Sequence, residues 1–161
     1  SHLAPYQPSL GIWKCPSDKS TSRHGGKPYP RVRSVTMNDF VGNMSDYVAT
    51  SRPDLQTVKR LADAVNPAPA NLFVLIDTSA ESIATGYFGM ETVDPASDPS
   101  TFTWTLVPAS YHGHAGSLSF ADGHAEVHRW KDARTWSAKL FTPSPKNQDV
   151  LWLLQHATGR K

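Results

Sequence analysis

The chain has 161 residues, a formal net charge of +2, and 39% hydrophobic and 10% aromatic residues. This length and aromatic content predict one globular domain over residues 1–161, with frayed ends at 1–10 and 157–161. The small, dispersed charge excludes the strongly basic balance of a nucleic-acid-binding protein, and no apolar run reaches the roughly 18 residues of a membrane span. The single cysteine, Cys15, excludes an internal disulfide.

The first half of the chain is predicted to be rich in loops. The short apolar stretch 11–15 is stopped by Pro16, and residues 17–30 have the composition of a surface loop. Alternation over residues 31–37 is typical of a half-buried strand. Between Pro53 and Val65, apolar residues recur at helical spacing and predict a helix.

The second half contains the stronger signals. The continuous apolar run over residues 72–77 predicts a strand that is covered on both faces and that ends at Asp77. Residues 84–108 predict two strands joined by a loop at 94–99. Residues 147–156 predict a short helix with Asn147 as its N-cap.

The clearest hairpin signal is Asp122-Gly123, because this dipeptide is typical of a two-residue turn between strands. It lies between residues 117–121 and 124–128. A two-residue turn would place Ser117 opposite His128. One face would then face the core and carry Leu118, Phe120, Ala125 and Val127. The other face would carry Ser117, Ser119, His124, Glu126 and His128.

The highest density of metal-ligating residues surrounds this hairpin. The candidate ligands are His112, His114, Asp122 and His124. Imidazole and carboxylate ligands suit zinc or another transition metal, whereas carboxylates with carbonyls suit calcium. Three such ligands and one open position for water would permit metal-assisted hydrolysis. The alternative is a structural role, in which Asp122 caps the turn and His112 hydrogen-bonds across the hairpin.

Two other chemistries remain open. Glycoside hydrolysis needs two carboxylates on either side of the scissile bond, and the available set is Asp77, Glu81, Asp122 and Glu126. Carbohydrate binding without catalysis needs exposed aromatic platforms, for which Trp130 is the best candidate. No Gly-x-Ser-x-Gly motif is present, and the sequence indicates no base beside Cys15.

The spacing of His112 and Asp122-Gly123 resembles the H-X9-DG signature of prepilin-type, pseudopilin-like proteins of environmental bacteria. The resemblance covers almost the whole chain. It includes the Trp-Lys-Cys-Pro-Ser-Asp segment at 13–18, the Ser-x-x-Met-Asn strand within 33–38, and the proline-led apolar strand within 66–77. It continues through 81–83, 120–132 and 149–158. Thr78 and His114 depart from the family pattern.

The resemblance implies an α+β, pilin-head-like fold: an antiparallel sheet with a DG-turn hairpin and one or two short helices. It also implies a long hydrophobic N-terminal helix ahead of this chain, which would anchor the native protein in the inner membrane or in a filament. The leading function is then the periplasmic or extracellular head of a type II secretion pseudopilin or type IV pilin-like subunit. Its partners would be other pilin-like subunits and the secretion machinery, with calcium as a loop-stabilising ion.

Whether the chain is an enzyme stays open. The alternative function is a secreted hydrolase that acts on polysaccharide or another polymer through the His/carboxylate site near the H-X9-DG motif, with or without zinc or another transition metal. The third is a carbohydrate-binding module.

Overall fold

The computed structural model describes residues 5, 9–42, 45–83, 86–89 and 96–161. Its centre is a five-stranded sheet in the order β5-β3-β4-β7-β8. The strands are β3 (Val35–Asn38), β4 (Phe73–Asp77), β5 (Tyr87–Phe88), β7 (Ala115–Phe120) and β8 (Ala125–Arg129). Neighbours are antiparallel except β3 and β5, which pair in parallel.

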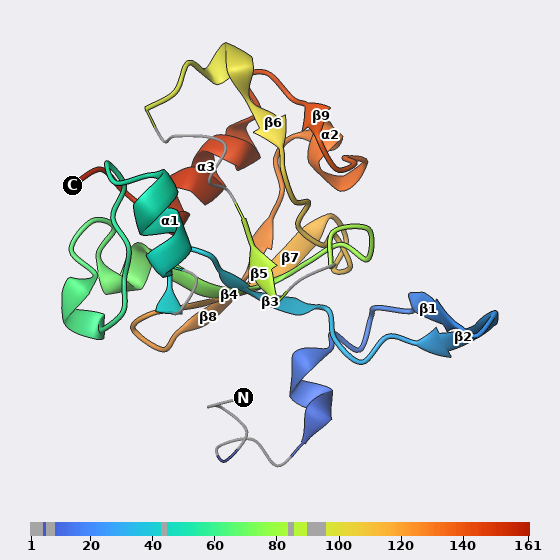
Figure 1. Cartoon of the computed structure of the whole chain (residues 1–161). Coiled ribbons are helices and arrows are strands. Elements are labelled where there is room, and N and C mark those ends of the chain that lie inside the picture. Colours follow the sequence, from blue (N-terminus) through green and yellow to red (C-terminus); the bar gives the residue numbers. More distant parts are fainter. Residues whose placement is uncertain (1–4, 6–8, 43–44, 84–85, 90–95) are drawn as a thin grey trace.

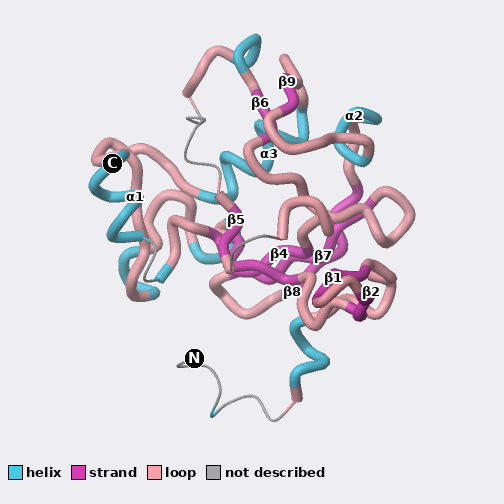
Figure 2. The backbone as a smooth tube through the Cα atoms, turned by 45° about the vertical axis from the view of Figure 1, so that its right-hand side comes forward, coloured by secondary structure: helices cyan, strands magenta, loops and turns pink. Residues whose placement is uncertain are grey.

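The remaining elements surround this sheet. Helices α1 (Ser45–Ser51), α2 (Ala133–Trp136) and α3 (Gln148–Ala157) are short. Two further sheets have two strands each: β1 (Thr21–His24) with β2 (Lys27–Pro30), and β6 (Thr103–Trp104) with β9 (Thr142–Pro143). Loops take up much of the tube in Figure 2. The α+β class expected from the sequence is confirmed. No described helix has the length and apolar character needed to cross a membrane.

The main core lies between the sheet and α3, which crosses one face of the sheet (Figure 1). Val150, Leu153, Leu154 and Ala157 give this helix a fully buried apolar face. Its N-terminus is capped as expected, because Asn147 Oδ1 accepts hydrogen bonds from the backbone N–H groups of Asp149 and Val150. The opposing residues include Phe73 and Ile76 of β4 and Leu118 and Phe120 of β7.

The opposite face of the sheet is less well covered. Val74 and Leu75 are only half-buried, so the strand expected over residues 72–77 is present but is not covered fully on both faces. On this side the sheet and the 3₁₀-helix Leu10–Trp13 line an open groove of about 560 Å³. Its apolar lining is provided by Leu10, Trp13, Val32, Val35, Met37, Leu75 and Tyr87.

The helix predicted between Pro53 and Val65 is wrong. Helix α1 ends at Ser51, and of the predicted helix only the 3₁₀ turn Leu61–Asp63 is helical. The backbone of this segment pairs instead with distant parts of the chain: Gln56 N donates to Gly159 O at 2.8 Å, and Val58 N donates to Phe40 O at 2.8 Å. These bonds take the N–H groups that a helix would use internally.

The same pairing orders the C-terminus, where residues 157–161 were expected to be frayed. Thr158 Oγ1 donates to Gln56 O at 2.7 Å, and Lys161 N donates to Asp54 O at 3.2 Å. Thr158 is only 3% exposed. The chain end is therefore held against the irregular segment 54–56.

The hairpin between β7 and β8 is present, but its register is one residue away from the expected one. Ser117 lies opposite Val127, not His128. Gly123 N donates to Phe120 O at 3.0 Å and Gly123 has φ of +97°, which makes a three-residue loop with a bulge rather than a two-residue turn.

This shift reverses the faces of β8, because successive side chains of a strand alternate between the two sides of a sheet. Val127, expected in the core, is 62% exposed. His124 and His128 instead lie on the face that meets α3. Their rings stack on Phe120 and Trp152, with centroid distances of 4.3 and 3.7 Å.

Candidate functional site

Three side chains from distant parts of the chain meet at one end of the central sheet. Cys15 follows the 3₁₀-helix Leu10–Trp13, Asp77 is the last residue of β4, and His112 precedes β7. His112 Nε2 lies 3.3 Å from Cys15 Sγ and 3.7 Å from Asp77 Oδ2. One ligand atom from each residue lies within 4.8 Å of the other two, which is close enough for all three to hold one metal ion.

The hydroxyl of Ser34 links the backbone of Cys15 to the carboxylate of Asp77. Cys15 N donates to Ser34 Oγ at 2.7 Å, and Ser34 Oγ donates to Asp77 Oδ1 at 3.4 Å. Ser34 N also donates to Trp13 O at 2.8 Å. Because Ser34 is 1% exposed, these bonds attach the N-terminal segment to the sheet in a place from which water is excluded.

The residues after Cys15 form a tight turn that keeps the thiol in place. Asp18 N donates to Cys15 O at 3.0 Å, with Pro16 at the second position of the turn, and Ser17 N donates to Cys15 Sγ at 3.4 Å. Asp18 is 3% exposed, and its Oδ1 accepts from Ser20 N at 2.8 Å. Its second carboxylate oxygen has no hydrogen-bond partner among the described residues.

A compact turn also places His112. His112 N donates to Ala115 O at 3.2 Å, and the two residues between them, Gly113 and His114, have φ of +65° and +67°. The ring of His114 packs on Trp136, with centroids 4.3 Å apart. The second imidazole of this loop therefore contacts Trp136, whereas His112 faces Cys15 and Asp77.

Several acidic groups surround the cluster. Burial raises the pKa of Asp77 above its usual value, although hydrogen bonds from Ser117 and the nearby His112 act in the opposite direction. Burial also raises the pKa of Tyr111 to about 12, with further contributions from the charges of Asp18, Asp77 and Cys15. Negative groups are thus concentrated on this side of the sheet.

The geometry differs from that of a cysteine–histidine–aspartate triad. In such a triad the two ring nitrogens have separate roles, because one faces the nucleophile and the other faces the carboxylate. Here Cys15 Sγ and Asp77 Oδ2 both approach the same atom, Nε2 of His112. The three groups therefore converge on one point and do not form a proton relay.

The structure does not bring the four sequence-predicted metal ligands together. Asp122 lies at the far end of β7 from His112 and His114, and a six-residue strand spans about 20 Å. Asp122 Oδ1 lies 2.6 Å from His124 Nδ1 and accepts from His124 N at 3.1 Å, and these hydrogen bonds lower the pKa of Asp122. Asp122 therefore caps the turn, as the structural alternative predicted, while His112 contacts other strands.

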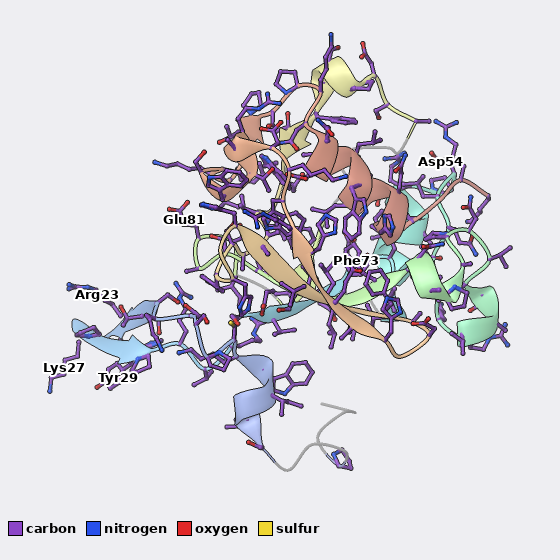
Figure 3. All side chains as sticks on the ribbon, turned by 180° about the vertical axis from the view of Figure 1, so that it is seen from behind. Arg23, Lys27, Tyr29, Asp54, Phe73 and Glu81 are labelled. Carbon is purple, nitrogen blue, oxygen red and sulfur yellow. The ribbon has the colours of Figure 1, made fainter. Side chains whose placement is uncertain are left out.

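The four predicted carboxylates are also dispersed. Asp77 is buried in the cluster, and Glu81 is exposed in the loop after β4, at the periphery of Figure 3. Asp122 and Glu126 lie in or near the hairpin turn, where Glu126 Oε1 is 3.4 Å from His128 Nδ1.

Trp130, the best candidate for an exposed aromatic platform, is buried instead. The residue is 2% exposed, and its indole Nε1 donates to Ala109 O at 2.8 Å. The indole packs over Gly116, where a side chain would collide with it. It is therefore a core residue and offers no platform for a sugar ring.

Cys15 belongs to the site but was not among the residues predicted from the sequence. Cys15, Asp77 and His112 lie in three separate segments of the sequence. What the sequence lacked was any indication that the three segments are neighbours in space.

Comparisons with protein-family models, with curated proteins and with solved structures find no match to this chain.

Proposed function

We propose that this chain is the globular head domain of a pilin-like filament subunit, on the periplasmic or extracellular side of an export or surface-appendage system. The observation that carries the proposal is the convergence of Cys15, Asp77 and His112. These residues come from three of the segments that resemble the prepilin-type proteins. Because the three residues lie in contact, we assign these segments one structural role, which is to hold the N-terminal segment against the sheet.

The N-terminal segment needs such a fixation because it contributes little to the core. The 3₁₀-helix Leu10–Trp13 has no buried residue, and Leu10 and Ile12 are 76% and 60% exposed. The strands of the β1–β2 hairpin contain no buried residue either. Apart from Cys15 and the half-buried Trp13, residues 9–31 therefore bury little apolar surface against the sheet. The attachment is supplied by the contact between Cys15 and His112 and by the hydrogen bonds that Ser34 makes with Trp13, Cys15 and Asp77.

The apolar groove on the open face of the sheet supports the same function. A pilin-like head must pack against the hydrophobic helix that the resemblance places ahead of this chain, and the groove lies next to the N-terminal segment. Its apolar side chains are typical of a surface that is covered in the assembled state. The proposed occupant is that helix.

The hydrolase and the carbohydrate-binding module have less support. Asp77 is 4% exposed, and Asp122 and Glu126 each pair with a histidine, so the candidate carboxylates give little support for an acid and a base on either side of one glycosidic bond. The aromatic residue expected to bind sugar is in the core. A head with a structural task accounts for the site without either activity.

The test uses the full-length protein, produced in cells that assemble pilin-like filaments. Sheared filaments and membranes are probed with antibodies against the head. We expect the head in both fractions, and we expect Met37→Glu, in the groove, to remove it from the filaments. Val65→Glu is the matched control, because Val65 is 74% exposed and does not line the groove. A head that never enters filaments, or Met37→Glu subunits that assemble normally, would contradict the proposal.

A further inference from the structure

We propose that Cys15, Asp77 and His112 bind a Zn²⁺ ion that joins the N-terminal segment to strand β4 and to the loop before β7. This inference goes beyond the head-domain proposal and does not depend on it, because the ligands all belong to one folded chain. It says that a metal ion joins the three side chains that lie in contact in the cluster.

Two of the three separations between the ligand atoms are close to those around a tetrahedral zinc ion, and the third lies within 4.8 Å. Zinc–sulfur bonds of about 2.3 Å and zinc–nitrogen or zinc–oxygen bonds of about 2.0–2.2 Å place the ligand atoms about 3.4–3.6 Å apart. The observed distances from His112 Nε2 are 3.3 Å to Cys15 Sγ and 3.7 Å to Asp77 Oδ2. Only small side-chain movements would therefore be needed to close the site around the ion.

The chemistry of the donors selects the metal. A thiolate is a soft ligand and an imidazole is a borderline one, and this pair favours zinc over calcium or magnesium, which prefer oxygen ligands. A thiolate and a carboxylate together carry two negative charges, which one Zn²⁺ ion neutralises. Such neutralisation matters here because Cys15 and Asp77 are only 6% and 4% exposed.

Asp18 provides an independent observation. Its carboxylate is 3% exposed and next to Cys15 in the turn, yet one of its oxygens has no hydrogen-bond partner among the described residues. A buried carboxylate oxygen without a partner is costly, and the charge of Asp18 acts on Tyr111 together with the charges of Asp77 and Cys15. Asp18 therefore adds to the negative charge that attracts the ion.

The ion would have a route of entry. The side chain of His112 is 31% exposed, so the cluster opens to solvent on this side. With three protein ligands, a fourth tetrahedral position remains for a water molecule. The shared Nε2 contact of Cys15 and Asp77 is then explained, because a metal ion draws all its ligand atoms toward one point.

The test measures metal binding by the purified chain. The protein is stripped with a chelator, and Zn²⁺ and Co²⁺ are titrated separately, with calorimetry for zinc and absorption spectroscopy for cobalt. We expect one ion per chain and a thiolate-to-cobalt charge-transfer band. The band reports Cys15 directly, since the chain contains one cysteine.

Three variants and one control identify the ligands. Cys15→Ser should remove the charge-transfer band, and Asp77→Asn and His112→Gln should each weaken zinc binding. Loss of a partner that only orients a metal ligand costs about 10–100-fold in affinity, so loss of a ligand should cost at least as much. His124→Gln is the matched control, because His124 pairs with Asp122 at the other end of β7 and should bind zinc like the wild type.

Two results would overturn the proposal. The first is a wild-type protein without zinc affinity or without the cobalt band, and this result needs no variant to fold. The second is alkylation of the Cys15 thiol at the same rate with and without zinc. Equal rates would mean that zinc does not bind the thiol, and they are expected if the thiol and the imidazole act as a nucleophile pair. Filament incorporation is read separately in cells, so either proposal can fail alone.

Discussion

The imidazole of His128 stacks on the indole of Trp152, with ring centroids 3.7 Å apart and an interplanar angle of 22°. The contact joins edge strand β8 to helix α3, and the same indole stacks on His156 at 4.0 Å. Burial lowers the pKa of His128, although the charges of Glu126 and Asp149 act in the opposite direction and His156 adds to the lowering. The contact between β8 and α3 therefore includes a histidine whose neutral form the fold favours.

We predict that the free energy of unfolding falls as the pH drops from about 7 to below the usual histidine pKa of about 6.5. The unfolded chain binds a proton on His128 more readily than the folded chain does, so acid favours unfolding. His128→Phe keeps the stacking and removes the titration. Urea unfolding across this pH range should show a shallower dependence for His128→Phe. His24→Gln is the control, because His24 is exposed. An equal pH dependence of the free energy of unfolding for His128→Phe and the wild type would contradict the prediction.

The second prediction concerns Asp149, whose carboxylate organises the start of α2. It is 1% exposed and accepts hydrogen bonds from the backbone N–H groups of Lys131 and Asp132 and from Thr135 Oγ1 at 2.6 Å. Asp149→Ala removes the acceptor of the partly buried Lys131 and Asp132 N–H groups, and it leaves the Thr135 hydroxyl only the longer contact with Asn147 Oδ1 at 3.5 Å. We expect the free energy of unfolding to fall by about 3 kcal/mol in urea denaturation.

The control for Asp149 is Asp54→Ala, because Asp54 pairs with Arg52 at the surface and should contribute little. Asp149→Asn retains one acceptor oxygen, so its effect should lie between those of the wild type and Asp149→Ala. Equal stability of Asp149→Ala and Asp54→Ala would show that the bonds to Lys131, Asp132 and Thr135 do not stabilise the fold.

The third prediction concerns Gly116, where β7 passes under Trp130. A Cβ atom at this position would lie 2.9 Å from both Ala109 O and Trp130 Cζ2. Gly116→Ala should therefore displace the indole and lower the free energy of unfolding by about 1–3 kcal/mol. Thermal unfolding followed by circular dichroism would measure the loss of stability. At Gly86 the nearest atom is 3.6 Å away, so Gly86→Ala should leave stability nearly unchanged.

Local patterns predicted several elements of the fold correctly. The strand β4, the hairpin of β7 and β8, and the Asn147-capped helix α3 follow from apolar runs, turn residues and caps that act over a few residues. The segment 53–65 has helical apolar spacing but is not a helix, because its backbone pairs with Phe40 and Gly159. Tertiary hydrogen bonds outweighed local preference there.

The site was harder to predict than the elements. Cys15 and His112 are 97 residues apart in the sequence, and only the order of the strands brings them together. The hairpin register depended on whether the Asp122-Gly123 turn has two or three residues in its loop, a difference of one residue that reverses β8. Short motifs do not contain either piece of information.

The β1–β2 hairpin stands apart from the rest of the molecule (Figure 1). Arg23, Lys27 and Tyr29 extend from it into solvent in Figure 3, and Arg31 N donates to Ser20 O at 3.2 Å where its two strands leave the body. Because its ends are adjacent and its strands bury no side chain, the arm is an exchangeable module. An epitope tag or a longer hairpin inserted between Ser20 and Arg31 would be displayed at a distance from the sheet without any repacking of the core.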